Sequence, residues 1–415
     1  MDAFPSPPRD ADSPLSDADS PRNARASRNL TVARWLLGDA GRAVLAALPP
    51  YRSDDVFALT ERLRREGLDA DQAAAALTLS RLRARAAAKF GERAGAMFFT
   101  ADGYEQATRL SVGALHAARF VEAGARRGID FGCGIGADSL AFTLAGLDVA
   151  AIESDPVAAL YAAANAPKAK VTCANGLATE LPDADAIWLD PARRAEDGRR
   201  IASPERWTPP FSRALSLARG FPLAGIKVAP GIAYHALPPR AFVEWISERG
   251  QLLEAVVWLG MGTGRAATID GEQLDSGAKT ADEPAVFVAP RPLGPLLFEP
   301  DPAIVRSGGI ARLCEKHGLA PVSEGIAYLT GEAAPPHCAA FEVLDVVVPE
   351  AKRIKRSLAA HGIGRTEVKK RGTEVDVAAM AKKLSGRGGD AGVVLFSPVL
   401  GRHRAIVARR TAVTF

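Results

Sequence analysis

The pattern of apolar and polar positions predicts three kinds of structure in succession along the chain. Between residues 29 and 123 the apolar residues recur at roughly helical spacing, and Ser53-Asp-Asp favours the start of a further helix. The alanine-rich segment 69–89 predicts another helix, with leucines among its apolar residues. We therefore expect a helical N-terminal domain over residues 29–123.

The central region consists instead of short apolar runs that end in polar side chains, as expected for strands that alternate with helices. Four runs are expected to be parallel strands, and the polar side chains at or near their ends are Asp130, Glu153, Asn175 and Asp190. The first run has little apolar support and is placed mainly by the glycine-rich turn after it. Further strands are expected at 224–229, 254–259 and 285–289. The last two would form an antiparallel hairpin, with the polar stretch 262–284 as its long loop.

The C-terminal part predicts a small α+β domain with a mixed sheet. Strands are expected at 341–348, 366–370, 391–396 and 404–408, with helices at 350–361 and 375–384. The first 28 residues are rich in Pro, Ser and Asp and are expected to be a disordered tail, because they cannot bury enough apolar surface to offset the cost of ordering. The expected segments are 1–28, 29–123, 124–293 and 294–415.

The glycine-rich turn after the first strand is the most informative motif. Asp130 precedes Gly132, Gly134 and Gly136, whose missing Cβ atoms allow a nucleotide-like ligand to lie against the backbone. A carboxylate beside the turn disfavours a diphosphate and suits a cationic ligand. S-adenosylmethionine carries both a sulfonium and an ammonium group, and is therefore the ligand that this turn predicts.

The other polar strand ends supply the remaining contacts that such a ligand needs, because doubly wound sheets bind ligands outside the carboxyl ends of their strands. Glu153 is placed to hold both ribose hydroxyls, and Asn175 to meet the adenine edge. Asp138 is expected either to cap the helix after the turn and contact the ligand's amino-acid end, or to act only as an N-terminal helix acid. Asp155 and Asp190 complete the predicted cofactor site.

These motifs resemble class I S-adenosylmethionine-dependent methyltransferases, most of all bacterial proteins that carry a C-terminal THUMP-like domain. The matching segments are DFGCGIGAD at 130–138, AIESDP at 151–156, LDPARR at 189–194, GIGRTEVKKRG at 362–372, GRHRAIVARR at 401–410 and KFGERAGAMFFTADGYEQATR at 89–109. The resemblance implies an α/β fold, with a doubly wound, Rossmann-like sheet of seven strands between the helical domain and a THUMP-like domain. It also implies S-adenosyl-L-methionine as the cofactor.

The segment after the fourth strand is the expected reaction site. In relatives that methylate amines, an Asp or Asn is followed by Pro, Pro and an aromatic residue, and the acid orients the target amine. Here Asp190 and Pro191 match, whereas Ala192 and Arg193 depart from the pattern. We expect Asp190, Pro191 and Arg193 to be catalytic. Arg193 or Arg194 stacks on a base or binds a phosphate, or both are solvated charges.

A dinucleotide enzyme is the main alternative, because Gly132, Gly134 and Ala137 also fit the G-x-G-x-x-A fingerprint. Glu153 lies near the distance at which that fingerprint places its ribose-binding acid. Asp130 argues against this interpretation, since it stands where pyrophosphate charge would approach. The sequence Asp190-Pro191 has no role in dinucleotide recognition.

Charge is distributed unevenly, and this changes the functional expectation. From residue 351 to the end there are 15 Lys and Arg but only 4 Asp and Glu, whereas the whole chain has a net charge of +4. A basic domain on an acidic body is typical of a polyanion binder. The THUMP-like resemblance implies RNA positioning, with Lys369, Lys370 and Arg371 as candidate phosphate contacts. A solvated basic surface without a ligand is the alternative.

The remaining composition indicates a soluble cytoplasmic enzyme. No run of about 18 apolar residues exists, so no membrane span is expected, and the first residues lack the pattern of a secretory signal. The four cysteines are scattered and predict free thiols, with neither disulfides nor a metal site. We expect methylation of a base in structured RNA, such as rRNA or tRNA. The alternatives are a methyltransferase for a small molecule or protein, and a non-catalytic RNA-binding protein with a vestigial fold.

Overall fold

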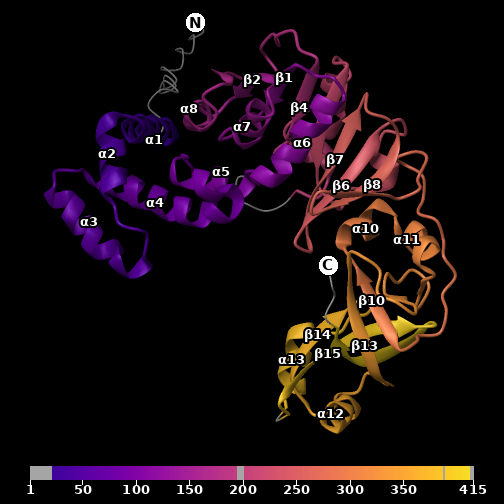
Figure 1. Ribbon diagram of the computed structural model, residues 1–415. Helices are drawn as coiled ribbons and strands as arrows, with labels where there is room; N and C mark the ends of the chain where they lie inside the picture. Colours follow the sequence, from indigo (N-terminus) through magenta and orange to yellow (C-terminus); the bar gives the residue numbers. More distant parts are fainter. Residues whose placement is uncertain (1–20, 194–200, 387, 412–415) are drawn as a thin grey trace, which may run out of the picture. The chain divides into compact units, whose positions relative to one another are not determined.

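The computed structural model describes residues 21–193, 201–386 and 388–411 (Figure 1). The chain divides into two compact units, Met1–Ala184 and Asp185–Phe415. This boundary falls inside the segment 124–293 that we expected to be one domain. Arg194, named above as a candidate contact, lies outside the described residues.

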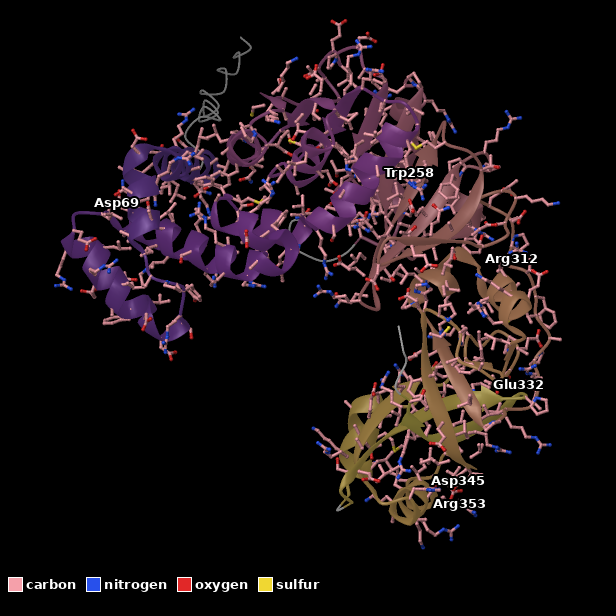
Figure 2. The ribbon with its side chains drawn as sticks, in the orientation of Figure 1. Asp69, Trp258, Arg312, Glu332, Asp345 and Arg353 are labelled. Atoms are coloured by element: carbon pink, nitrogen blue, oxygen red, sulfur yellow. The ribbon has the colours of Figure 1, made fainter. Side chains whose placement is uncertain are left out.

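Six helices precede the first strand in the described part of the first unit. They are α1 (Pro21–Leu37), α2 (Asp39–Ala47), α3 (Val56–Arg65), α4 (Ala70–Phe90), α5 (Ala101–Gln106) and α6 (Leu110–Glu122). Helix α1 begins inside the tail 1–28 that we expected to be disordered, so that expectation is wrong for residues 21–28. Asp69 and Gln72 form a capping box that fixes the start of α4 (Figure 2).

The same unit contains three parallel strands in the order β3-β2-β1. They are β1 (Arg127–Phe131), β2 (Asp148–Glu153) and β3 (Lys170–Cys173), connected by α7 (Ala137–Leu144) and α8 (Pro156–Asn165). One buried apolar cluster joins Leu79 and Leu82 of α4 to Ile135 and Leu140 beside the glycine-rich turn. The N-terminal helices therefore share a core with the strands that carry the candidate cofactor site.

The second unit begins with six strands in the order β4-β5-β7-β6-β8-β9. They are β4 (Ala186–Leu189), β5 (Leu223–Val228), β6 (Phe242–Glu248), β7 (Gln251–Leu259), β8 (Gly264–Ile269) and β9 (Glu272–Asp275), with α9 (Phe211–Ala218) between β4 and β5. Strands β4 and β5 are parallel, and β7 is antiparallel to β5. Strands β8 and β9 extend the expected set of seven.

The antiparallel hairpin is not where the sequence placed it. Strands β6 and β7 form it, connected by Arg249 and Gly250, both of which have positive φ. The expected strand 285–289 has no regular structure, and Val286 and Phe287 in it are exposed. The polar stretch 262–284 contains β8 and β9 instead of a long loop. Buried polar side chains such as Glu244 and Arg265 interrupt the apolar pattern of β6 and β8.

The C-terminal sheet has seven described strands in the order β11-β12-β10-β13-β16-β15-β14. The strands are β10 (Leu296–Pro300), β11 (Ala320–Pro321), β12 (Leu329–Thr330), β13 (Cys338–Val347), β14 (Ile363–Lys370), β15 (Asp390–Val399) and β16 (Arg402–Arg410). The helices are α10 (Pro302–Ser307), α11 (Ile310–His317), α12 (Ala351–Ala360) and α13 (Val377–Leu384). Ile354 of α12 and Leu384 of α13 belong to one buried cluster with Val394 and Phe396 of β15, so both helices pack against the sheet. No described helix is long and apolar enough to cross a membrane.

Candidate functional site

The glycine-rich turn presents open backbone at one position and close packing at another. Gly132, Gly134 and Gly136 all have positive φ, of 77°, 54° and 80°. A Cβ atom on Gly134 would meet nothing within 4 Å, whereas on Gly136 it would lie 2.9 Å from Cα of Ala162 in α8. Gly136 therefore allows α8 to approach, and Gly134 leaves space for a ligand.

Glu153 at the end of β2 is tied to this turn. Its Oε2 accepts a hydrogen bond from the Gly134 backbone N–H at 2.8 Å, and its Oε1 accepts one from the Asp155 N–H at 2.8 Å. The side chain is half-buried. A carboxylate has about four acceptor positions, so Glu153 keeps the capacity to accept hydrogen bonds from ribose hydroxyls.

Two of the predicted acids are buried and serve neighbouring elements. Asp130 accepts a hydrogen bond from the Ser139 hydroxyl of α7 at 2.5 Å. Asp138 accepts one from the Thr108 hydroxyl at 2.7 Å, and its other oxygen lies 3.0 Å from Nδ1 of His116 in α6. Asp138 thus joins α6 to α7. A contact between Asp138 and the ligand's amino-acid end stays a prediction.

Asp155 and Asn175 are exposed residues with clear local roles. Asp155 caps α8 by accepting a hydrogen bond from the Ala158 N–H at 2.7 Å. Asn175 accepts one from the Leu177 N–H at 3.1 Å, which closes a tight turn after β3. The next residue is Gly176, where a Cβ atom would lie 2.4 Å from the Phe131 ring. Close packing of Gly176 on β1 thus fixes the position of Asn175.

Asn165, which the sequence analysis missed, holds the turn from the other side. This buried side chain ends α8, accepts a hydrogen bond from Phe98 N–H at 2.8 Å, and donates to the carbonyls of Phe98 at 2.9 Å and Ile135 at 2.8 Å. Ile135 lies within the glycine-rich turn. Asn165 therefore attaches the segment before α5 to the candidate cofactor site.

Helix α5 packs directly against the same turn. A Cβ atom on Gly103 would lie 2.5 Å from Cγ2 of Ile135, so only glycine permits this approach. Lys89 of α4 donates to the carbonyl oxygens of Tyr104, Glu105 and Ala107 at 2.7, 3.1 and 3.0 Å. A cation at a helix C-terminus is favourable, and Lys89 thereby fixes α5 in place.

Asp190, which directly follows β4, is the least buried member of a charged cluster within the second unit. Its Oδ2 lies 2.8 Å from Nζ of Lys227 in β5, and that Nζ lies 3.7 Å from Oε2 of Glu254 in β7. The side chain of Asp190 is 28% exposed, whereas those of Lys227 and Glu254 are 6% and 5% exposed. The sequence analysis missed Lys227, although a lysine inside an apolar strand is itself an unusual signal.

The residues after Asp190 differ in exposure. Pro191 is buried, Ala192 is exposed, and Arg193 is half-buried. The backbone of Ala192 pairs with Thr208 through hydrogen bonds of 2.8 and 3.1 Å, which fixes the start of this segment. Arg193 is the last described residue before position 194.

Three of the four cysteines, Cys133, Cys314 and Cys338, are buried and poorly suited to thiol chemistry. Burial, aided by the nearby carboxylates of Asp130 and Glu153, raises the pKa of the Cys133 thiol well above its ordinary value. Burial also raises the pKa of Cys314 to about 11 and that of Cys338 to about 12. Thiolate nucleophiles are disfavoured at these positions. No cluster of metal-ligating side chains occurs among residues that the structure describes.

The candidate RNA contacts at the end of β14 and directly after it are largely engaged within the protein. Lys369 pairs with Glu299 of β10, and Arg371 lies 3.6 Å from the same carboxylate. Lys370 is exposed. Two of the three predicted phosphate contacts therefore already have an acidic partner.

A second group of cations lies on α12 and α13. Its exposed members are Lys352, Arg353, Lys355, Arg356, Lys382 and Lys383. Arg353, labelled in Figure 2, pairs with Glu350 at 3.3 Å, and it is the one member with an acidic partner among the described residues. The two helices pack together on the sheet. We call these six residues the helical basic surface.

Two family models match parts of the chain, and known methyltransferases resemble most of it. Residues 338–410 match the family described as THUMP domain-like, and residues 29–86 match a domain of unknown function, DUF8688. An uncharacterized S-adenosylmethionine-dependent methyltransferase of Mycobacterium tuberculosis is 32% identical over 328 residues, which cover 74% of this chain and 87% of that protein. The crystal structure of a putative methyltransferase from Porphyromonas gingivalis W83 superposes with a TM-score of 0.67 at 15% identity, covering 88% of this chain and 100% of that one.

Proposed function

The chain belongs to the S-adenosylmethionine-dependent methyltransferases, and we propose that it methylates structured RNA. The observation that supports an RNA substrate is the helical basic surface on the domain that matches the THUMP-like family. Exposed cations that pair with no acid among the described residues are available to neutralise phosphates, and each such contact releases counterions on binding. Membership of this family rules out the alternative of a dinucleotide-dependent enzyme.

The residues of the first unit fit the cofactor because open space above Gly134 adjoins the half-buried carboxylate of Glu153. We propose that the glycine-rich turn and Asp130 shape the methionine end of the site, that Glu153 holds the ribose and that Asn175 meets the adenine. When bound, S-adenosylmethionine supplies an electrophilic methyl group with a good leaving group. The protein's own contribution is then mainly to orient the acceptor, and we assign that role to Asp190.

Changing Glu153 to alanine is expected to weaken binding of S-adenosylhomocysteine about 10- to 100-fold, because hydrogen bonds to a charged group contribute roughly 1.5–3 kcal/mol. Part of this loss comes from the turn, since Gly134 N–H also loses its acceptor. Isothermal calorimetry measures the affinity. Asp155→Ala is the matched control: it removes an exposed helix cap beside Glu153 and should cost mainly stability. An unchanged affinity in Glu153→Ala would contradict the ribose assignment.

Two triple variants test the RNA surface. Changing Lys352, Lys355 and Arg356 to Ala should weaken binding to structured RNA and reduce the slope of log K against log salt by about 0.7–0.9 for each phosphate that the variant no longer neutralises. Changing Lys369, Lys370 and Arg371 to Ala should lower the slope less, because Glu299 already neutralises part of that charge. Filter binding of total tRNA and rRNA from 50 to 300 mM salt, a range of about sixfold, compares the two.

If the slope of log K against log salt is unaltered in one of these variants, the residues changed in that variant do not contact RNA. If the unmodified protein binds no RNA near physiological salt, the proposed substrate is wrong, and a small-molecule or protein substrate takes its place. Circular dichroism of each variant establishes that the change in binding does not come from unfolding.

A further inference from the structure

Two arginine side chains of the N-terminal helices meet at one buried aromatic ring. The guanidinium carbon of Arg42 in α2 lies 5.2 Å from the centre of the Phe98 ring, and that of Arg83 in α4 lies 5.1 Å from it. Phe98 is buried, Arg83 is half-buried and Arg42 is exposed. The fold thus brings two like charges to one ring at the surface of the first unit.

Each guanidinium is held in place by a backbone carbonyl. Nε of Arg42 donates a hydrogen bond to the Leu37 carbonyl at 2.8 Å, and Nε of Arg83 donates one to the Met97 carbonyl at 2.9 Å. A guanidinium has five N–H donors, and these bonds use one of them in each side chain. The terminal nitrogens of both arginines are therefore positioned and still able to bind a ligand.

No acid among the residues that the structure describes forms an ion pair with Arg42 or Arg83. Burial, and after it the charge of Arg42, lower the pKa of Arg83 below its ordinary value. Arg52 of the same helical region, by contrast, pairs with Asp55 at 3.8 Å. Two neighbouring cations without a counterion are unfavourable for folding alone, because like charges repel. The pair therefore points to an anion that binds both.

We propose that Arg42 and Arg83 together bind one phosphate group of the RNA strand. This inference rests on the RNA substrate proposed above and adds a contact on the first unit to the helical basic surface. A guanidinium offers paired N–H donors that match two phosphate oxygens, and stacking on a ring leaves that edge free. The adjoining stretch 81–93 has five Lys and Arg but only one Asp or Glu, which suits a chain of phosphates better than a single free anion.

The ring that carries the arginines is attached to the candidate cofactor site. Phe98 N–H donates to Oδ1 of Asn165 at 2.8 Å, and Nδ2 of Asn165 donates to the carbonyls of Phe98 and Ile135 at 2.9 and 2.8 Å. Ile135 belongs to the glycine-rich turn. A phosphate on the arginine pair therefore has a fixed position relative to that turn. Both arginines lie in the segment 29–86 that matches a domain of unknown function, and the inference gives this domain a task.

Neutral variants of the two arginines test the phosphate site. Arg42→Gln and Arg83→Gln should each weaken binding of total tRNA and rRNA about tenfold, as expected for hydrogen bonds to a charged group. The double variant should lose about 20-fold and not about 100-fold, because both side chains bind the same phosphate and their effects are coupled. Its slope of log K against log salt should fall by about 0.7–0.9, which corresponds to one phosphate. Binding of S-adenosylhomocysteine should be unchanged, since Phe98 and Asn165 remain.

Arg52→Gln is the matched control. It removes the same charge from the same helical region, but from a side chain that is 74% exposed and already pairs with Asp55, so RNA affinity and salt slope should not change. Arg42→Gln should unfold at the wild-type temperature or above it, because it removes a like charge beside Arg83. A lower unfolding temperature with unaltered RNA binding would assign the pair to packing and overturn the inference. If Arg83→Gln fails to fold, the exposed position of Arg42 still tests the site.

The outcomes separate this inference from the proposed function. If the wild type binds RNA and the helical basic surface variant weakens that binding, but Arg42→Gln and Arg83→Gln behave like Arg52→Gln, the phosphate site is wrong and the RNA substrate stands. If the wild type binds no RNA near physiological salt, both fail. Inorganic phosphate tests a free anion. If it raises the unfolding temperature of the wild type but not of Arg42→Gln, and both bind RNA equally, the pair holds a small anion and the strand contact is contradicted.

Discussion

Replacing Asp190 with alanine is expected to lower kcat for methyl transfer about 100-fold, the loss expected when a reacting group is misplaced by about 1 Å. The carboxylate is the least buried member of the cluster with Lys227 and Glu254, and under the proposed assignment its loss removes the group that orients the acceptor. Asp190→Asn keeps the shape and a carbonyl oxygen that accepts hydrogen bonds, so it should retain more activity than alanine.

Single-turnover assays with saturating cofactor measure this step directly. Asp183→Ala is the matched control, because Asp183 is an acid shortly before β4 whose side chain is 87% exposed and pairs with Arg127 at 2.9 Å. Its loss should change the rate less than about twofold, as expected for a surface ion pair. Equal rates for Asp190→Ala and Asp183→Ala would exclude Asp190 from the acceptor site.

Asn165→Ala is expected to destabilise the protein by about 3–5 kcal/mol, because each buried polar group left without a partner costs roughly 1–3 kcal/mol. The change removes the acceptor for Phe98 N–H and the donor to the carbonyls of Phe98 and Ile135. Cofactor affinity should fall as well, since Ile135 belongs to the glycine-rich turn. Urea denaturation followed by circular dichroism measures the stability.

Asn175→Ala provides the comparison for stability. Asn175 is exposed, and its side chain accepts one hydrogen bond from a backbone N–H two residues on, so its loss should cost less than about 1 kcal/mol. Similar destabilisation by the two asparagine variants would show that the buried hydrogen bonds of Asn165 contribute little.

The positions of residues at the end of a strand, or in the turn that follows it, could be predicted from the neighbouring sequence. The glycine-rich turn located β1 despite its weak apolar pattern, and Glu153 and Asp190 lie where the pattern placed them, at the end of β2 and directly after β4. The family confirmed the cofactor and the Rossmann-like fold. Each of these inferences needs only a strand, the turn after it and the chemistry of the next side chain.

Partners brought together by folding could not be predicted. Asn165 and Phe98 are 67 residues apart, and nothing near either residue indicates that they meet. Lys369 and Arg371 looked available for phosphates because Glu299 is distant in sequence. Strand β6 was missed because its Glu244 is polar yet buried, where it accepts a hydrogen bond from Nε1 of Trp258 at 3.0 Å. Conversely, the apolar run 285–289 suggested a strand but is largely exposed.

The shared core of α4, α5 and the glycine-rich turn has a consequence for how the protein can be divided. A fragment that began at the first strand would expose Ile135 and Leu140 to water and leave Asn165 without Phe98. The cofactor-binding strands are therefore not an autonomous module that could be excised or transplanted. With the cofactor bound at the turn as proposed, its binding would stabilise the N-terminal helices too, so we expect it to slow proteolysis between α4 and α5.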